Sequence, residues 1–312
     1  MLSMYNDPTT GRLVEVRPSA MGDASDFGAP SLIPSTPVVP DAELVWIYTS
    51  WLDAIATSRS LQASATISML DSGELAYGAE GLEEHFASLD RRHLSDEQVS
   101  WVTMALSKLS NIRLSPTFAL CGSLHGDQLA LWREYARNQG VALALPAGAD
   151  LKVLEERRGG AGLPMGMRTG WRRVLYSRPQ QVELLRECVA YMLDHVGDVE
   201  RCAAAYLHCV AFVKHPAYEV EQEVRSVFYW SDAGQQLDQF VRYRPGTQMP
   251  FIELAQSDGG VANFTGERAL PSIRAVALAP PQRDVSRNRT EASVKTLLGD
   301  VEVVRSRIPS WL

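Results

Sequence analysis

The sequence predicts an α+β fold with mixed, largely antiparallel sheets. Strand-like and helix-like segments are mixed along the chain, without the strict β–α–β alternation of a doubly wound sheet. Two strand-like runs, "QFVRYR" and "PFIELA", follow one another around "PGTQM". The chain has 312 residues, of which 46% are apolar, so it can bury a substantial core.

The first forty residues differ in composition from the rest of the chain. The stretch "DPTTGRLVEVRPSAMGDASDFGAPSLIPSTPVVPD" mixes Pro, Gly, Ser and Thr with no apolar period. We predict a disordered or loosely ordered arm over residues 1–40 and a single α+β domain over residues 41–312.

In the first half of the domain, strand-like and helix-like patterns alternate irregularly. Short apolar runs predict strands, and apolar residues spaced three and four apart predict amphipathic helices. The predicted strands are 43–50 ("ELVWIYTS"), 117–123 ("TFALCGS") and 140–146 ("GVALALP"), and the predicted helices are 51–58, 81–92, 96–112 and 127–137.

The second half begins after a Gly-rich connection, "LEERRGGAGLPMGMRTGW". A long helical pattern over 179–213 is interrupted near "HVGD". Strands are predicted at 171–177, 223–230, 239–244, 250–255, 273–280 and 301–309, and a further helix at 286–300.

Charge and cysteine content exclude several classes of protein. The 30 basic and 37 acidic residues give a net charge of −7, which argues against broad electrostatic binding to nucleic acid or an anionic membrane. The four cysteines form no CxxC pair, and no signal peptide or membrane-length apolar run is present. We therefore expect a soluble cytoplasmic protein with reduced thiols and without a metal site.

The common catalytic motifs are absent. The sequence contains no G-x-x-x-x-G-K-[ST], G-x-S-x-G or H-E-x-x-H. P-loop ATPases, typical α/β hydrolases and zincins are therefore not expected.

The densest group of carboxylates lies in "KHPAYEVEQEVRSVFYW". Pro216 suits a first helical turn, so we predict one or two helical turns followed by a strand that starts at Glu223. Alternate strand residues share a face. One face would carry Glu223, Arg225, Val227 and Tyr229, and the other Val224, Ser226, Phe228 and Trp230.

Two readings of these acids are possible. Glu221 and Glu223 could do differentiated work, one ionised and the other a hydrogen-bonding partner. Alternatively, both are exposed and pair with Arg225 or Lys214, which is the commoner situation for charged residues.

Three further groups could contribute to a site. The hydroxyls in "YTS" (Tyr48, Thr49, Ser50) could bind ribose or phosphate, or cap a helix. Asp71 and Glu74 are expected to flank a turn, where an exposed acid is the ordinary case. Trp132, Arg133 and Tyr135 could form a stacking and anion-binding shelf, although a half-buried helix also uses a Trp.

The order of these segments resembles a bacterial domain-of-unknown-function family, number 2971. The resemblance rests on "YTS", "LDSGELAYG", "CGS", "LALWREYARNQGVALAL", "VLYS", "FVKHPAYEVEQEVRSV", "FIELA", "LPSIRAVALAP", "SVKTLL" and "SRIP", and covers Leu44 to Pro309. The chain departs from the family pattern at Ile47, Leu70 and Val224. This resemblance implies a domain but not a reaction.

A more distant similarity is to the ADP-ribosyltransferases, which hold NAD in a cleft between two small mixed sheets with flanking helices. It implies that Glu223 is the key carboxylate, holding the ribose and stabilising oxocarbenium charge, and that Glu221 serves the acceptor. The candidate NAD-binding residues are Tyr48, Thr49, Ser50, Asp71, Glu74, Ser123, Trp132, Arg133, Tyr135 and Arg225.

The resulting functional expectation is an NAD-consuming transferase or glycohydrolase that cleaves an N-glycosidic bond, with an unknown acceptor, in defence or toxin biology. Two alternatives remain open at this point. One is a non-enzymatic nucleotide sensor or interaction module, and the other is a nucleoside- or nucleotide-processing enzyme of a small-molecule pathway.

Overall fold

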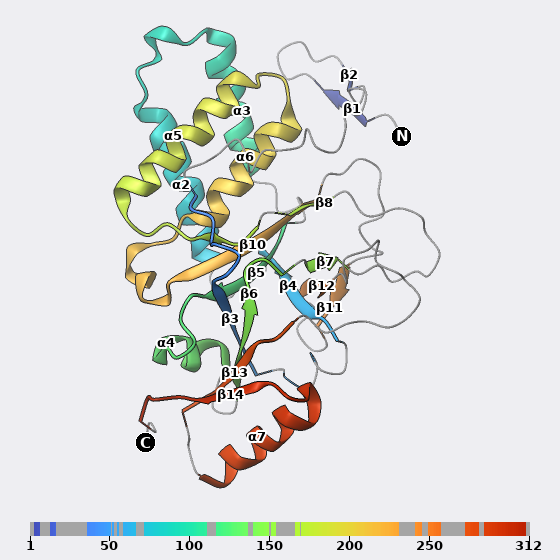
Figure 1. Ribbon diagram of the computed structural model, residues 1–312. Helices are drawn as coiled ribbons and strands as arrows, with labels where there is room; N and C mark the ends of the chain where they lie inside the picture. Colours follow the sequence, from blue (N-terminus) through green and yellow to red (C-terminus); the bar gives the residue numbers. More distant parts are fainter. Residues whose placement is uncertain are drawn as a thin grey trace.

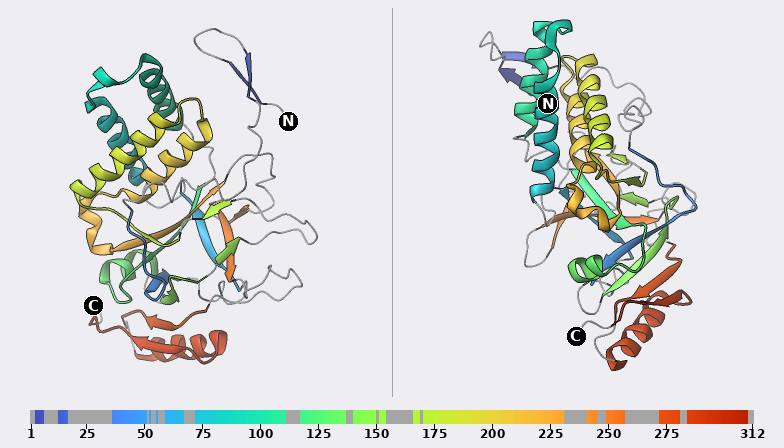
Figure 2. Two further views of the ribbon diagram at one scale, coloured as in Figure 1. Left: turned by 45° about the horizontal axis from the view of Figure 1, so that its top comes forward. Right: turned by 90° about the vertical axis from the view of Figure 1, so that its left-hand side faces the viewer.

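The computed structural model describes residues 3–6, 13–16, 36–50, 52, 55, 59–66, 72–110, 117–136, 140–149, 151–153, 166–168, 170–230, 241–244, 249–256, 272–280 and 284–309. A group of helices covers one end of a long twisted sheet, and a single helix lies at the other end (Figure 1). The views in Figure 2 show the same separation. The predicted α+β class is confirmed.

The sheet is almost entirely antiparallel among the described strands. Its main order is β11-β12-β4-β5-β3-β6-β13-β14, with β10 on β5, β8 and β9 on β10, and β7 on β12. The described pairing between β13 and β14 is parallel. The bounds are β3 Leu44–Thr49, β4 Leu61–Ala65, β5 Thr117–Ser123, β6 Val141–Pro146, β7 Leu151–Val153, β8 Gly166–Arg168, β9 Arg172–Arg173, β10 Glu223–Trp230, β11 Val241–Tyr243, β12 Pro250–Gln256, β13 Ala275–Leu278 and β14 Glu302–Arg305.

Strand β5 is central to the sheet. It pairs with β10 from Thr117 to Ser123, and Ser123 lies opposite Glu223. On its other edge it pairs with β4 near one end and with β3 at the other end, at Ser123. A Cβ on Gly122 would lie 2.5 Å from Val45 Cγ1, so β3 can approach this end of β5 only where the side chain is absent.

Four helices form the layer at one end: α2 Ser72–Ser88, α3 Asp96–Ser110, α5 Arg178–Asp194 and α6 Val199–Phe212. The predicted break near "HVGD" is confirmed, because Gly197 adopts a φ of 88° and the Asp198 side chain accepts a hydrogen bond from Arg201 N at the start of α6. At the opposite end, α7 (Asp284–Leu298) packs Val294 into the core beside β13 (Figure 1).

The core has two main parts, one on each face of the sheet near β10. Val227 packs with the helices, whereas Val224 and Phe228 pack in the cluster on the opposite face. The predicted alternation of faces along β10 is confirmed for these residues. The two buried faces explain why this strand has few exposed positions.

Several predicted elements differ in extent. The predicted turn at Glu74 is the first turn of α2, and Asp71 lies outside the described residues. The predicted helix at 127–137 is a short α-turn, α4 (Leu129–Leu131), followed by a π-turn, η5 (Trp132–Ala136). Of the predicted helix at 51–58, only Leu52 and Ile55 are described, both as helical.

The N-terminal part of the chain contains structure before residue 40. Strands β1 (Ser3–Asn6) and β2 (Leu13–Val16) pair antiparallel. Residues 36–40, here called the strap, run beside β9: Val39 N donates to Trp171 O, and Arg173 N donates to Pro37 O, both at 2.9 Å. Thr36 is completely buried. These contacts join the strap, which precedes the predicted boundary at residue 41, to the body of the fold.

Within the described ranges, no helix combines the length and the apolar character that a membrane crossing requires.

Candidate functional site

Five charged side chains meet where the helical layer joins β10. They are called the charge cluster: Glu74 from α2, Lys214 after α6, Glu221 at the end of the 3-10 helix η7 (Pro216–Glu221), and Glu223 and Arg225 on β10. When all are ionised, three carboxylates face two cations, so the cluster carries one net negative charge.

Lys214 lies at the centre of the charge cluster. Its Nζ atom is 2.7 Å from Glu74 Oε1, 2.8 Å from Glu221 Oε2 and 3.1 Å from Glu223 Oε2. The Lys214 side chain is only 1% exposed. Because a buried ammonium is unfavourable without partners, the three carboxylates are required to keep this lysine charged inside the protein. Burial alone would lower the pKa of Lys214, but the neighbouring carboxylates raise it.

Arg225 connects the sheet to the helical layer. Its Nε donates to Glu223 Oε1 and its Nη2 to Glu223 Oε2, both at 2.8 Å, which is a bidentate pair. Nη2 also donates to Glu74 Oε2, and Nη1 donates to the carbonyl of Ala211 at 2.8 Å. The pair with Glu223 follows from the strand geometry, because i and i+2 side chains share a face.

The turn between Glu221 and Glu223 brings both acids to Lys214. Gln222 between them adopts the left-handed conformation, with φ 44° and ψ 46°. This conformation is unfavourable for a residue other than glycine and occurs frequently at functional positions. It ends η7 and starts β10 within one residue, as the sequence pattern predicted.

The two acids of this turn differ in their electrostatic state. Burial opposes ionisation of Glu223, but Arg225 and Lys214 outweigh it and lower its pKa to about 2. For Glu221, burial outweighs the hydrogen bond from Lys214, and the pKa is raised. The alternative reading, in which both acids are exposed, is wrong, because their side chains are 12% and 8% exposed. Their predicted pairing with Lys214 and Arg225 is confirmed.

Backbone hydrogen bonds hold the turn in place from both sides. The Tyr176 hydroxyl accepts a hydrogen bond from Glu223 N at 3.0 Å. The Ser123 hydroxyl donates to the carbonyl of Glu221 at 2.8 Å. The Ser123 side chain therefore positions the backbone of the turn from Glu221 to Glu223, here called the acidic turn.

Two aromatic residues lie beside the charge cluster. The Lys214 Nζ atom is 4.8 Å from the centre of the Tyr218 ring, a cation–π contact. Burial, and to a smaller extent the charges of Glu223 and Glu221, raise the pKa of Tyr135. Tyr218 and Tyr135 are each 37% exposed, so both rings are open to solvent.

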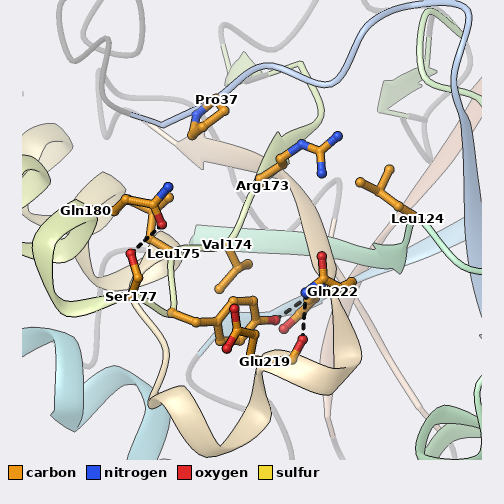
Figure 3. Close-up of a pocket in the computed structure, with 11 residues that line it drawn as sticks. Pro37, Leu124, Arg173, Val174, Leu175, Ser177, Gln180, Glu219 and Gln222 are labelled. Atoms are coloured by element: carbon orange, nitrogen blue, oxygen red, sulfur yellow. Dashed lines mark hydrogen bonds between the residues drawn. The ribbon is translucent and has the colours of Figure 1, made fainter.

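A pocket of about 190 Å³ borders the acidic turn (Figure 3). Its walls are the strap, the segment from β9 to the start of α5, and the end of η7. The lining residues are Pro37, Leu124, Arg173, Val174, Leu175, Tyr176, Ser177, Gln180, Glu219, Gln222 and Glu223. Of the predicted site residues, this pocket contains Glu223.

The structure brings together part of the predicted site. Glu74, Ser123, Glu221, Glu223 and Arg225 are in direct contact around Lys214 or the acidic turn. The charges of Glu223 and Glu221 also contribute to the raised pKa of Tyr135.

Other predicted residues lie elsewhere. Tyr48 and Trp132 pack edge to face, with their ring centres 4.8 Å apart. Trp132 is completely buried, and its Nε1 donates to Asp127 Oδ1 at 2.8 Å. Neither ring lines the pocket beside Glu223. Thr49 is buried at the end of β3, whereas Ser50 and Arg133 are exposed.

Several residues of this region were not predicted as site residues. Lys214, which the sequence suggests as an ion-pair partner of the two acids, is the centre of the charge cluster. The pocket residues Arg173, Tyr176 and Gln180 lie in and beyond "WRRVLYS", which was read as a simple strand. In "FVKHPAYEVEQE", a short turn that starts at Pro216 separates Lys214 from Glu221 and Glu223. This spacing is the sequence signal that the lysine and the acids can meet.

Comparison of the chain with protein families, curated proteins and solved structures gives no match. Among the described residues, no group of three or more His, Cys, Asp or Glu side chains has a geometry that could hold a metal ion.

Proposed function

We propose that the protein is an NAD-consuming enzyme that cleaves the N-glycosidic bond between nicotinamide and ribose. One observation supports this proposal above the others: in the turn that borders a polar pocket, the pKa of Glu221 is raised and the pKa of Glu223 is lowered. Pairs of carboxyl groups with separated pKa values are typical of sites that divide two catalytic roles.

The proposed reaction assigns one role to each acid. The bond between ribose C1′ and the nicotinamide nitrogen breaks, and its electron pair leaves with nicotinamide. The ionised Glu223 lies on the ribose side and stabilises the positive charge that develops on the sugar. Glu221, whose raised pKa makes it a stronger base than an ordinary carboxylate, takes the proton of the attacking water or acceptor hydroxyl. The products are nicotinamide, the ADP-ribosylated acceptor or free ADP-ribose, and one proton.

A second candidate is a nucleotide-binding module without turnover. Both oxygens of Glu223 are already occupied by Arg225, and Lys214 adds a further bond to Oε2. A carboxylate neutralised in this way stabilises a developing cation less well than a free one. In a binding module without turnover, the charge cluster would fix the shape of the pocket, and the bound nucleotide would dissociate unchanged.

Release of nicotinamide from NAD distinguishes the two candidates. We compare the full chain with Glu221→Gln and with Glu97→Gln, an exposed acid on α3 that serves as a control for loss of one negative charge. The enzyme hypothesis predicts that Glu221→Gln lowers the rate by ~100-fold or more while NAD binding, measured by calorimetry, is retained. The control should behave as the unmodified chain.

Three results would decide the matter. Binding of NAD without nicotinamide release supports the module. Neither binding nor release contradicts both candidates. Release that is unchanged in Glu221→Gln contradicts the assigned role of this acid.

A further inference from the structure

We propose that the pocket beside the acidic turn recognises a phosphorylated pentose, with the phosphate at Arg173 and the sugar hydroxyls at Gln180, Gln222 and Glu219. The inference deepens the proposed function and rests on it for the reacting end of the ligand. Recognition of the sugar phosphate is argued from the pocket itself.

One wall of the pocket provides hydrogen-bond donors and a positive charge. Arg173 lines the pocket, and in Figure 3 its guanidinium points toward Leu124, another lining residue. Its ion pair with Glu43 is long, at 3.5 Å, and both side chains are about two-fifths exposed, at 40% and 41%. Such an exposed pair is weak, so a phosphate can displace it and accept two parallel hydrogen bonds from the guanidinium.

Gln180 adds neutral donors on another side of the pocket. Its Oε1 accepts a hydrogen bond from the Ser177 hydroxyl at 2.7 Å. Because the oxygen is occupied, the amide Nε2 is the group left for a ligand, and among the described residues it has no hydrogen-bond partner. Figure 3 shows Gln180 and the Arg173 guanidinium on different sides of Val174, so the two residues provide donors at separate points of the lining.

The opposite wall provides acceptors. Gln222 Nε2 donates to the carbonyl of Glu219 at 2.9 Å, which leaves Gln222 Oε1 as an acceptor. The Glu219 side chain makes no ion pair with any described residue. An amide oxygen and a carboxylate in the lining of one pocket suit a ligand with several hydroxyl groups, which donate hydrogen bonds to such acceptors.

The size and the apolar part of the lining restrict the ligand further. The volume of about 190 Å³ is below the ~300–1,000 Å³ of sites that enclose a whole drug-sized ligand. The pocket therefore holds one part of a nucleotide, and the remainder extends outward. Pro37, Leu124 and Val174 provide an apolar surface against which the carbon atoms of a sugar ring can pack.

The test uses ribose 5-phosphate as the probe and isothermal calorimetry on the full chain. We expect ribose 5-phosphate to bind at least tenfold more tightly than ribose or inorganic phosphate. Arg173→Gln should reduce its affinity at least tenfold, and Gln222→Ala should reduce the affinities of ribose 5-phosphate and ribose by similar factors. The matched control is Arg178→Gln, because Arg178 starts α5, pairs with Glu84 at 3.8 Å and does not line the pocket.

The proposal is overturned if ribose 5-phosphate binds no more tightly than inorganic phosphate. Equal losses in Arg173→Gln and Arg178→Gln would also overturn it, because they would indicate only long-range attraction. Tighter binding of a free amino acid, whose carboxylate and ammonium could face Arg173 and Glu219, would overturn it as well.

The nicotinamide assay separates this inference from the proposed function. Binding of ribose 5-phosphate with the expected dependence on Arg173, but without nicotinamide release, leaves the inference standing and removes the enzymatic function. Nicotinamide release with an unchanged KM for NAD in Arg173→Gln leaves the function standing and removes the inference.

Discussion

At the scale of single residues, His208 on α6 is a buried titratable group that is not part of the charge cluster. Its ring is 0% exposed, and Nε2 lies 2.9 Å from Thr36 Oγ1. Burial, with a smaller contribution from Arg172, lowers its pKa from 6.5 to about 3. The folded protein therefore keeps this imidazole neutral at pH values where the unfolded chain protonates it.

This difference predicts acid sensitivity in a defined pH window. Because the folded pKa is below the unfolded value, the contribution of His208 to stability is complete above pH 6.5 and decreases as the pH falls towards 3. The free energy of unfolding should decrease by about 1.4 kcal/mol per pH unit below the unfolded pKa. Urea denaturation at several pH values from 7 to 5 measures it, with His208→Gln as the comparison.

In the His208→Gln variant, the free energy of unfolding should depend less steeply on pH in this window. The difference in slope should correspond to about one proton taken up on unfolding. The contribution of Glu223 to stability also decreases in acid, but only below its unfolded pKa of 4.5. It therefore does not interfere with the measurement between pH 7 and 5. Equal slopes for the variant and the unmodified chain would show that His208 is not the responsible group.

At the scale of elements, the close approach of α2 and α6 depends on a glycine. A Cβ on Gly78 would lie 2.8 Å from Val210 Cα, a backbone atom that cannot move aside cheaply. Gly81, one turn further along α2, has space: its Cβ would meet Leu185 side-chain atoms at 3.6 Å, an ordinary contact. The same substitution at the two positions should therefore have opposite effects.

We predict that Gly78→Ala lowers the free energy of unfolding by ~1–3 kcal/mol, because the added methyl group forces the helices apart. Gly81→Ala should raise it by up to ~1 kcal/mol, because alanine is the better helix former. Urea denaturation of both variants measures the difference. Stabilisation by both substitutions would show that α2 can shift and that the helix contact is not tight at Gly78.

The same scale shows what the sequence could predict and why. Proline at 216 and alternation after Glu223 are local signals, and they correctly predicted the change from η7 to β10. The strand β4, "LQASA", was missed because alternating small residues give little apolar signal. The start of α2 was read as a turn because its glycines lower helix propensity, and packing against α6 overrides this preference.

At the scale of the whole molecule, the candidate site could be predicted only where its residues share one strand. Glu223 and Arg225 meet because alternate positions share a face, which the sequence shows directly. The contact between Arg225 and Glu74 joins residues 151 positions apart, and no local pattern determines it. The pocket is more dispersed still, since the strap, the β9–α5 segment and η7 each contribute one wall.

The strap, residues 36–40, should contribute both to the stability of the fold and to ligand binding. Thr36 and Val39 are 0% and 2% exposed, and Arg172 Nη1 donates to the Thr36 carbonyl at 2.8 Å. A chain that starts at Asp41 should therefore unfold more easily than one that starts at Thr36, by ~2–4 kcal/mol for one buried apolar side chain and the lost hydrogen bonds.

The shorter chain should also bind ribose 5-phosphate more weakly, because Pro37 forms part of the pocket. Urea denaturation and calorimetry on the two chains measure both effects. The control is Val38→Ala in the longer chain, because this side chain is 58% exposed and its loss should leave stability nearly unchanged. Identical unfolding of the two truncated chains would show that the strap does not stabilise the fold. Identical binding of ribose 5-phosphate would show that Pro37 is not a required wall of the pocket.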